Sequence, residues 1–314
     1  MPLPKPRINE SEKDFIDRCI IDAEVQNEFP ELDQRIAVCN NLYRPTTKAA
    51  KFDSQRFMFG LERKRDVQER NWSRQFSRFY FNEYKKGIKQ FLETNNVSEL
   101  GLFRFTDFED LMVGMFTGMG WVFASWYMRS INNYQTKQQT TNPDDLKAIW
   151  EQKMIAYAKQ YSAAKIGLIQ GTALQNLRKI IKAFMADPDF MSKGIEEKSR
   201  ILNNKFKQLS RWQAKRIVRT ESTTISNIGL EQGAEAMFPK EQLEKRWITS
   251  MDGNERVWHG AMNNKIVDFD KKFTVPHPKG VDYMLRAGDP SASAANRVNC
   301  RCAVVPVPKP DEFD

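Results

Sequence analysis

Apolar residues recur every three or four positions over most of the chain, and the spacing changes to strand-like alternation only after about residue 240. A repeat of three or four places apolar side chains on one face of a helix, whereas alternation places them on one face of a strand. The predicted helices span residues 11–27, 32–43, 56–89, 111–128, 144–161 and 166–184, then one that begins near 192 and one over 210–236. The predicted strands span residues 245–249, 265–267, 272–275 and 298–304. The pattern predicts a mainly helical α+β protein, with N-terminal helical regions followed by a small C-terminal α+β domain with short strands.

Breaks in this pattern divide the chain into three regions. Residues 1–45 form a predicted helical hairpin with a proline break between its helices. Cys19 and Cys39 both face inward in this hairpin, and we interpret them as two small apolar residues packed together, in preference to a disulfide or a metal site. Residues 46–165 form a basic helical region, and residues 166–314 form the α+β domain.

The predicted helix over residues 56–89 is the most basic part of the chain, with ten Lys or Arg residues against four acids. Trp72, Phe76 and Phe79 recur within it at helical spacing. Aromatic side chains among Arg residues can stack on the bases of a single strand. The helical spacing instead favours aromatic side chains buried on one face of the helix and cations on the solvent-exposed face. A basic face of this kind could lie against DNA without reading any base.

Residues 111–128 carry no charge and include Gly114, Gly118 and Gly120. The length and the small-residue spacing fit a membrane helix. The three glycines and the polar balance of the whole chain fit a buried helix of a bundle better, so we expect no membrane partner. The alternative that this segment leaves open is insertion into a membrane, by a protein that is delivered into a cell with DNA.

Glu221 lies on the same predicted helical stripe as Ile217, Ile225 and Ile228. A buried carboxylate is costly unless it is paired and hydrogen-bonded, so a cation should meet it in the fold. Its neighbours Arg219 and Thr220 point in other directions, because successive residues turn by about 100° around a helix. We therefore expect the partner of Glu221 to be Arg256 or the Lys245-Arg246 pair.

Polar residues also gather near the end of the chain. Asp252 can cap a short helical turn on which Arg256 and His259 face the same way. In the predicted strand over residues 298–304, alternation puts Cys300 and Cys302 on one face with valines, and puts the intervening polar side chains on the other face. Those side chains belong to Asn299 and Arg301.

Three interpretations of these residues compete. Cys300, Cys302, His259 and His277 provide the number and type of ligands for a tetrahedral zinc site, although a C-x-C pair with distant histidines is a weak spacing signal. Thiols packed in a core explain the same alternation. We favour the core, and so expect no cofactor, with zinc as the alternative.

The second interpretation is a nuclease-like enzyme centred on His259 and Glu221. Arg256, Asp252 and Arg301 would supply further acid, base and phosphate-binding groups. The sequence has no nucleophile elbow, phosphate loop or cluster of metal-binding carboxylates beside them. The third interpretation, which we favour over an enzyme, is that these polar residues hold a small domain together and display a docking surface.

The order and spacing of these motifs resemble the phage head-morphogenesis domain, the Mu F-like minor head protein family. The resemblance covers about residues 166–305 and is strongest over Arg216–Glu221, Lys245–His259 and Asn299–Cys302. The residues singled out for the motif are Arg219, Thr220, Glu221, Asn227, Trp247, Asp252, Arg256, His259, Asn299, Cys300, Arg301 and Cys302.

The resemblance implies a minor head protein of a tailed phage that acts in head assembly at the portal vertex or the inner capsid. Its expected partners are the portal protein, the major capsid protein, or both, with non-specific contact to packaged DNA. Its expected location is the virion, after assembly in the host cytoplasm.

Composition agrees with this interpretation. The formal charge of +9 and the pI near 9.3 favour a polyanionic neighbour. Four cysteines in 314 residues do not make a disulfide scaffold, and the N-terminus has no apolar segment typical of a secretory signal. We therefore expect synthesis in a reducing compartment.

Overall fold

A computed structural model of the protein describes residues 4, 7, 10–32, 35–36, 38–39, 52–98, 100–101, 105–131, 143–250 and 253–309. Two compact units make up this part of the chain. The N-terminal unit contains the first two helices, and the main unit contains the described residues within 54–128 and 141–314.

The N-terminal unit contains α1 (Glu12–Ile20) and α2 (Ala23–Glu28), where one helix over residues 11–27 was predicted. The break falls at Asp22, whose side chain accepts a hydrogen bond from the backbone of Glu24 and so starts a new helix. Cys19 and Cys39 form a disulfide, so the prediction of two unbonded thiols is wrong. Their Cα atoms lie 5.8 Å apart, a separation that sequence spacing alone does not reveal.

Most of the predicted helix over residues 32–43 lies outside the described residues, and its described positions are helical. The expected loop over residues 132–142 also lies outside the described residues.

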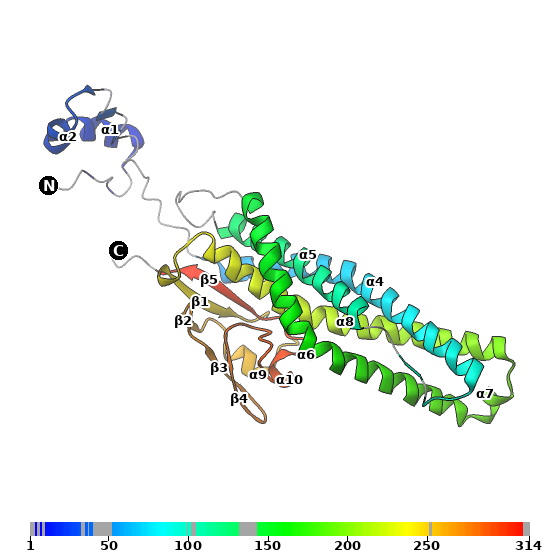
Figure 1. The fold of residues 1–314 in the computed structure, drawn as a ribbon. Coiled ribbons are helices and arrows are strands. Elements are labelled where there is room, and N and C mark those ends of the chain that lie inside the picture. The colour runs from blue at the N-terminus through cyan, green and yellow to red at the C-terminus, as the bar shows by residue number, and fades with distance from the viewer. Residues whose placement is uncertain are drawn as a thin grey trace. The chain divides into compact units, whose positions relative to one another are not determined.

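Long helices form the body of the main unit (Figure 1). They are α4 (Ser54–Thr94), α5 (Phe105–Ile131), α6 (Pro143–Met185) and α8 (Ile195–Glu235), with the short α7 (Pro188–Ser192) between the last two. Phe76 is fully buried and Trp72 and Phe79 are half-buried, which confirms that the aromatic stripe of α4 faces the protein interior.

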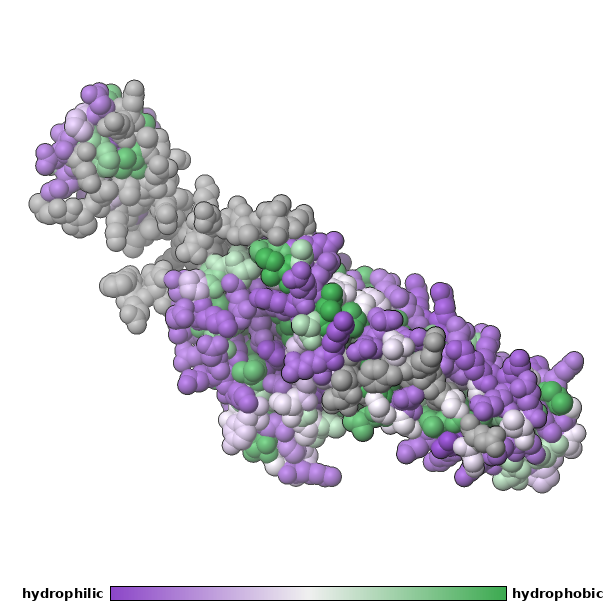
Figure 2. Space-filling view, viewed as in Figure 1, coloured by the Kyte–Doolittle hydropathy of each residue, from purple (hydrophilic) through white to green (hydrophobic). Residues whose placement is uncertain are grey.

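The apolar segment over residues 111–128 lies within α5 and packs into this bundle. The indole of Trp72 lies against Gly114 and Gly118, so these small residues let a bulky side chain approach the helix. None of the helices described here has both the length and the apolar character needed to cross a membrane. The visible face of the main unit is mostly hydrophilic, with scattered hydrophobic residues (Figure 2).

Two pairs of predicted helices are single helices in the structure. α6 continues through residue 165, where the sequence analysis places a domain boundary. α8 continues through Ser210, which was predicted to cap a new helix. The Ser210 hydroxyl instead donates to the carbonyl of Phe206 inside the helix, a bond that a buried serine makes without ending a helix.

A small antiparallel sheet lies at the C-terminal end of α8 (Figure 1). Strand β1 (Leu243–Ile248) is central, with β2 (Ile266–Asp268) on one side and β5 (Ala303–Pro308) on the other. A separate hairpin pairs β3 (Phe273–His277) with β4 (Gly280–Met284). The short helices η2 (Lys240–Gln242), α9 (Val257–Gly260) and α10 (Ala294–Arg297) connect these strands.

These elements confirm the predicted mainly helical α+β fold class, but they correct the last strand. β5 begins at Ala303, so Cys300 and Cys302 lie in the loop before the strand and not within it. Asn299 opens this loop with a φ of 56°, a left-handed conformation that asparagine tolerates. Both thiols are nevertheless buried in one core with Trp247 and Val304.

Candidate functional site

Glu221 is buried on α8, and its partner is Arg297 of α10. The guanidinium Nη2 of Arg297 lies 2.7 Å from Oε1 of Glu221, and the hydroxyl of Tyr161 donates to the same oxygen at 3.1 Å. Burial lowers the pKa of Arg297. The predicted burial and pairing of Glu221 are thus confirmed, whereas the predicted partner is wrong.

Two of the three cations that were expected to pair with Glu221 contact backbone carbonyls instead. Arg256 donates to the carbonyl of Val298 at 2.6 Å, and Lys245 donates to the carbonyl of Leu285 at 2.8 Å. Burial lowers the pKa of Lys245. Both side chains therefore hold loops of the small domain in place.

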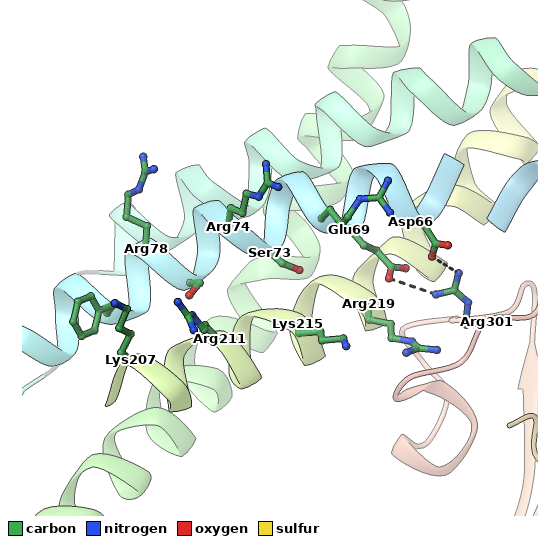
Figure 3. Close-up of a pocket in the computed structure, with 13 residues that line it drawn as sticks. Asp66, Glu69, Ser73, Arg74, Arg78, Lys207, Arg211, Lys215, Arg219 and Arg301 are labelled. Atoms are coloured by element: carbon green, nitrogen blue, oxygen red, sulfur yellow. Dashed lines mark hydrogen bonds and ion pairs between the residues drawn. The ribbon is translucent and has the colours of Figure 1, made fainter. Parts of the chain in front are cut away.

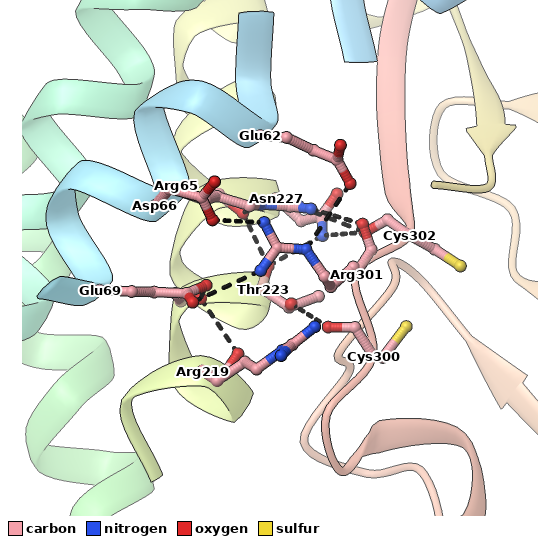
Figure 4. A network of polar contacts seen from close by, with 12 residues as sticks. Glu62, Arg65, Asp66, Glu69, Arg219, Thr223, Asn227, Cys300, Arg301 and Cys302 are labelled. Carbon is pink, nitrogen blue, oxygen red and sulfur yellow. Dashed lines mark hydrogen bonds and ion pairs between the residues drawn. The ribbon is translucent and has the colours of Figure 1, made fainter. Parts of the chain in front are cut away.

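Arg65 of α4 fixes the loop that carries the two cysteines (Figure 4). Its fully buried guanidinium donates to Ser226 Oγ at 2.8 Å and to the carbonyls of Arg301 and Cys302 at 2.5 and 3.2 Å. Burial, together with the nearby charge of Arg301, lowers the pKa of Arg65 to about 10. One side chain from the first long helix thus links α8 to the last strand.

The sequence analysis missed Arg65, although a signal for it exists. Arg65 lies on the buried stripe of α4, four residues after Leu61 and seven before Trp72. The same reasoning that singled out Glu221 among isoleucines would have identified this cation.

Arg301 crosses from the loop to the acidic side chains of α4. Its guanidinium lies 2.9 Å from Asp66, 3.4 Å from Glu69 and 3.6 Å from Glu62. Burial opposes the charged form, but the carboxylates of Glu69, Asp66 and Glu62 outweigh it and raise the pKa of Arg301. The motif residue Arg301 therefore joins the loop before β5 to α4 by ion pairs.

Polar side chains on α8 satisfy the rest of the loop backbone. Asn227 donates to the carbonyl of Ala287 at 3.0 Å and accepts from the backbone of Val304 at 2.6 Å. Thr223 donates to the carbonyl of Cys300, and Thr220 accepts from the backbone of Asn299 at 3.3 Å. The structure thus brings the motif residues Thr220, Asn227 and Asn299 into one network.

His259, Cys300 and Cys302 form a buried cluster next to this network. The Nδ1 atom of His259 lies 3.6 Å from Cys300 Sγ and 3.5 Å from Cys302 Sγ. The edge of the Trp247 ring packs against the imidazole, with 5.7 Å between ring centroids. His277 lies elsewhere, 3.8 Å from Asp282, so the structure brings together three of the four residues considered for zinc.

Of the residues considered for nuclease chemistry, His259, Arg256 and Arg301 line one small cavity, whereas Glu221 does not. His259 and Glu221 are both buried, and each contacts a different group of side chains, while Arg256 contacts a carbonyl. Asp252 lies outside the described residues.

A basic groove of about 890 Å³ runs between α4 and α8 (Figure 3). We call it the α4–α8 groove. Its lining consists of Asp66, Glu69, Arg70, Ser73, Arg74, Ser77, Arg78, Phe81, Lys207, Arg211, Lys215, Arg219 and Arg301. Eight of these residues are cationic and two are anionic. The two acids lie at the end where Arg301 pairs with them, so the rest of the groove is uniformly positive.

Helical spacing produces this row of cations. Arg70, Arg74 and Arg78 recur every four residues on α4, and Lys207, Arg211, Lys215 and Arg219 recur every four residues on α8. Apart from Arg219, which is half-buried, all of them are exposed. Within the described parts of the chain none of these seven forms an ion pair, so their charge is directed at the solvent in the groove. The sequence analysis noted the basic character of α4 but missed the four-residue repeat on α8.

Comparison with known proteins matches residues 161–305 to the family described as phage Mu protein F like protein. A 119-residue segment is 30% identical to an NAD(+)–arginine ADP-ribosyltransferase of Enterococcus faecalis (strain ATCC 700802 / V583), covering 38% of this chain and 23% of that protein. A 101-residue segment is 29% identical to the minor head protein GP7 of Bacillus phage SPP1, covering 31% of this chain and 30% of that protein. The chain thus spans less than a third of either relative. No solved structure matches the chain.

Proposed function

We propose that this chain, whose residues 161–305 match the Mu F-like family and which is similar over one segment to a phage minor head protein, is a structural component of a tailed-phage head whose α4–α8 groove binds the phosphate backbone of packaged DNA. The observation that carries the DNA contact is the double row of seven cations without ion-pair partners among the described residues. In this role the protein acts during head assembly, inside the capsid or at the portal vertex.

The groove has the chemistry of a phosphate-binding surface. Lys and Arg side chains neutralise phosphates and release counterions, which gives affinity without sequence preference. The α8 row runs from Lys207 to Arg219, which are twelve positions apart, or about 18 Å along the helix. That length spans roughly five phosphates of one DNA strand at about 3.4 Å each along the axis.

The DNA contact can be tested by measuring how affinity depends on salt. We would compare the wild type with the groove variant Arg70→Gln/Arg74→Gln/Arg78→Gln, using fluorescence anisotropy on duplexes of two unrelated sequences. Each lost phosphate contact reduces the magnitude of the negative slope of log K against log salt by about 0.9. The slope of the groove variant should therefore be smaller in magnitude than that of the wild type by about 2 to 3. Both duplexes should bind equally well.

A control variant with the same change in net charge distinguishes the effect of the groove cations on DNA affinity from the effect of the overall charge. The variant Lys153→Gln/Lys179→Gln/Lys182→Gln removes the same three charges from exposed positions on α6. Its salt dependence should stay close to that of the wild type. Equal losses in the two variants would assign the DNA contact to overall charge and would contradict the groove as its site.

The assembly role has a separate test. When co-expressed with the portal and major capsid proteins of its own phage, the chain should co-purify with at least one of them or enter the heads that form. Its absence from assembled heads would contradict the proposed role even if the groove binds DNA.

A further inference from the structure

The spacing of His259, Cys300 and Cys302 fits a metal ion. Their ligand atoms all lie within 4.8 Å of one another, and all three residues are buried. In a tetrahedral zinc site, bonds of about 2.3 Å to sulfur and about 2.0–2.1 Å to nitrogen place neighbouring N and S ligands about 3.5–3.6 Å apart. The observed Nδ1–Sγ distances are 3.6 and 3.5 Å, so an ion would fit with little movement of the backbone.

Asn296 fixes the imidazole in the tautomer that a metal requires. The amide Nδ2 of Asn296 lies 2.9 Å from Asp282 Oδ2, which can only accept, and this orients Asn296 Oδ1 toward the ring. That oxygen lies 2.8 Å from the indole nitrogen of Trp258, a donor, and 3.0 Å from Nε2 of His259. The proton of the ring is therefore on Nε2, and the lone pair of Nδ1 points at the two thiols. Outer hydrogen bonds of this kind are typical of metal-binding histidines.

The open side of the cluster faces a cavity of about 30 Å³, which is room for about one water molecule. Glu255 lines the cavity, and its Oε2 atom is buried and hydrogen-bonds to no described residue. Arg219, Arg256 and Arg301 line it as well. A water in this cavity could donate to the carboxylate oxygen, and the guanidinium groups favour anionic sulfur nearby.

We propose that His259 Nδ1, Cys300 Sγ and Cys302 Sγ bind one zinc ion, and that its fourth ligand is a water molecule that donates a hydrogen bond to Glu255. Two thiolates and an imidazole are soft and intermediate ligands, and a tetrahedral set of them selects Zn²⁺ over Mg²⁺, Ca²⁺ or Mn²⁺. The ion joins α9 to the loop before β5, the loop that Arg65 also holds. This assignment is independent of the DNA contact.

Metal content of the full-length protein tests the site. The chain would be purified under reducing conditions, stripped with a chelator and dialysed against Zn²⁺, and the bound metal would be measured by elemental analysis and native mass spectrometry. The wild type should retain about one zinc per chain. The variants His259→Ala, Cys300→Ser and Cys302→Ser should lose it, and the control His277→Ala should keep it.

Two measurements on the wild type keep the test decisive if the variants fail to fold. Co²⁺ substituted for Zn²⁺ should give the intense visible spectrum of a tetrahedral site with sulfur-to-metal charge transfer, and chelation should lower the unfolding temperature until Zn²⁺ is restored. A wild-type chain that takes up neither ion and unfolds at the same temperature with and without chelator would overturn the proposal. A Cys300–Cys302 disulfide that forms under the same reducing conditions would overturn it too.

Discussion

Arg65 illustrates how single residues stabilise this fold. Its guanidinium is fully buried, and its donors reach one hydroxyl and two carbonyls from segments far away in sequence. A charge in such a position is tolerated because each of these hydrogen bonds is made, and removing the donor leaves the carbonyl of Arg301 without a partner among the described residues. Glu221 and Arg297 are a second pair of buried charges, with 2.7 Å between Arg297 Nη2 and Glu221 Oε1.

Replacing Arg65 should therefore destabilise the main unit strongly. Arg65→Met keeps the length and apolar stem of the side chain but removes three buried hydrogen bonds and leaves the carbonyl of Arg301 without a partner among the described residues, so the free energy of unfolding should fall by about 3 kcal/mol. Urea denaturation followed by tryptophan fluorescence measures this. Lys64→Met, at the exposed neighbouring position, should change stability by less than about 0.5 kcal/mol. Similar values for the two variants would contradict the role given to Arg65.

Asp282 makes stability depend on acidity. Burial alone would raise the pKa of Asp282, but hydrogen bonds from Ser293 and Asn296 outweigh burial and lower it from the ordinary value of 3.8. A carboxyl with a lowered folded-state pKa stabilises the fold above its unfolded pKa, and this stabilisation is lost as the pH falls through the folded-state value.

We predict that the wild type and Asp282→Asn differ in how their stability changes between about pH 6 and about pH 2. The free energy of unfolding of the wild type should fall more steeply below about pH 4 than that of Asp282→Asn, which cannot ionise at this position. Circular dichroism at a series of urea concentrations and pH values provides the measurement. Parallel pH curves for the two proteins would show that Asp282 does not contribute.

Among the secondary-structure elements, α5 and α8 pack unusually closely. A Cβ added at Gly229 would lie 2.8 Å from Phe123 Cβ and 3.0 Å from the carbonyl oxygen of Gly120, and one added at Gly233 would lie 2.8 Å from the carbonyl oxygen of Ala124. Glycines four residues apart thus let the two backbones approach each other. Neither contact is with the end of a flexible side chain, so the helices would have to separate to accept a methyl group.

Gly229→Ala and Gly233→Ala should each destabilise the protein by about 1–3 kcal/mol through overpacking, despite the better helix propensity of alanine. Gly171→Ala on α6 is the matched control, because nothing lies within 4 Å of the added Cβ. There the helix propensity should act alone and stabilise the protein by roughly 0.5–1 kcal/mol. Thermal unfolding of the three variants would distinguish these signs.

The sequence predicted the helices well because their apolar repeats are long, but it did not predict where they end. Ser210 and Gln213 have the spacing of a helix start, yet Ser210 bonds to a carbonyl within α8. Alternation after Val298 likewise predicted a strand, although the ladder with β1 begins only at Ala303. The local sequence pattern does not show where a helix or strand begins, because segments that are distant in sequence decide which backbone groups form hydrogen bonds.

The candidate sites were predictable to different degrees. The clustering of His259 with both cysteines was among the alternatives drawn from residue type, and the burial of Glu221 followed from its stripe. Arg297 was not predictable as its partner, because it lies on a four-residue helix whose direction depends on the tertiary fold. The groove arises from two helices more than a hundred residues apart in sequence, so neither row of cations alone indicates it.

At the scale of the whole molecule, the segment that matches the family lacks two of the long helices that α8 and the sheet pack against. Residues 161–305 leave out α4, which packs along α8 and supplies Arg65 as well as Tyr84, whose hydroxyl donates to Gln213 at 2.5 Å. α5 is left out too, and its Tyr127 donates to the carbonyl of Pro306 at 2.7 Å. The buried face of α8 would be open to water without these helices.

We therefore expect residues 161–305 expressed alone to lack cooperative unfolding, and residues 54–314 to unfold cooperatively with a midpoint close to that of the full chain. Heating followed by circular dichroism compares the fragments. A sharp transition of the short fragment at the full-chain midpoint would show that α4 and α5 are dispensable for folding.

The contact between Arg65 and the carbonyl of Arg301 joins residues 236 positions apart. On the ribosome α4 emerges long before its acceptors have been made, so the centre of the main unit can close only once translation is nearly finished. A truncated product that stops short of Arg301 retains a desolvated cation with two of its three acceptors missing. We therefore expect such a product to be degraded by cellular proteases faster than the full chain.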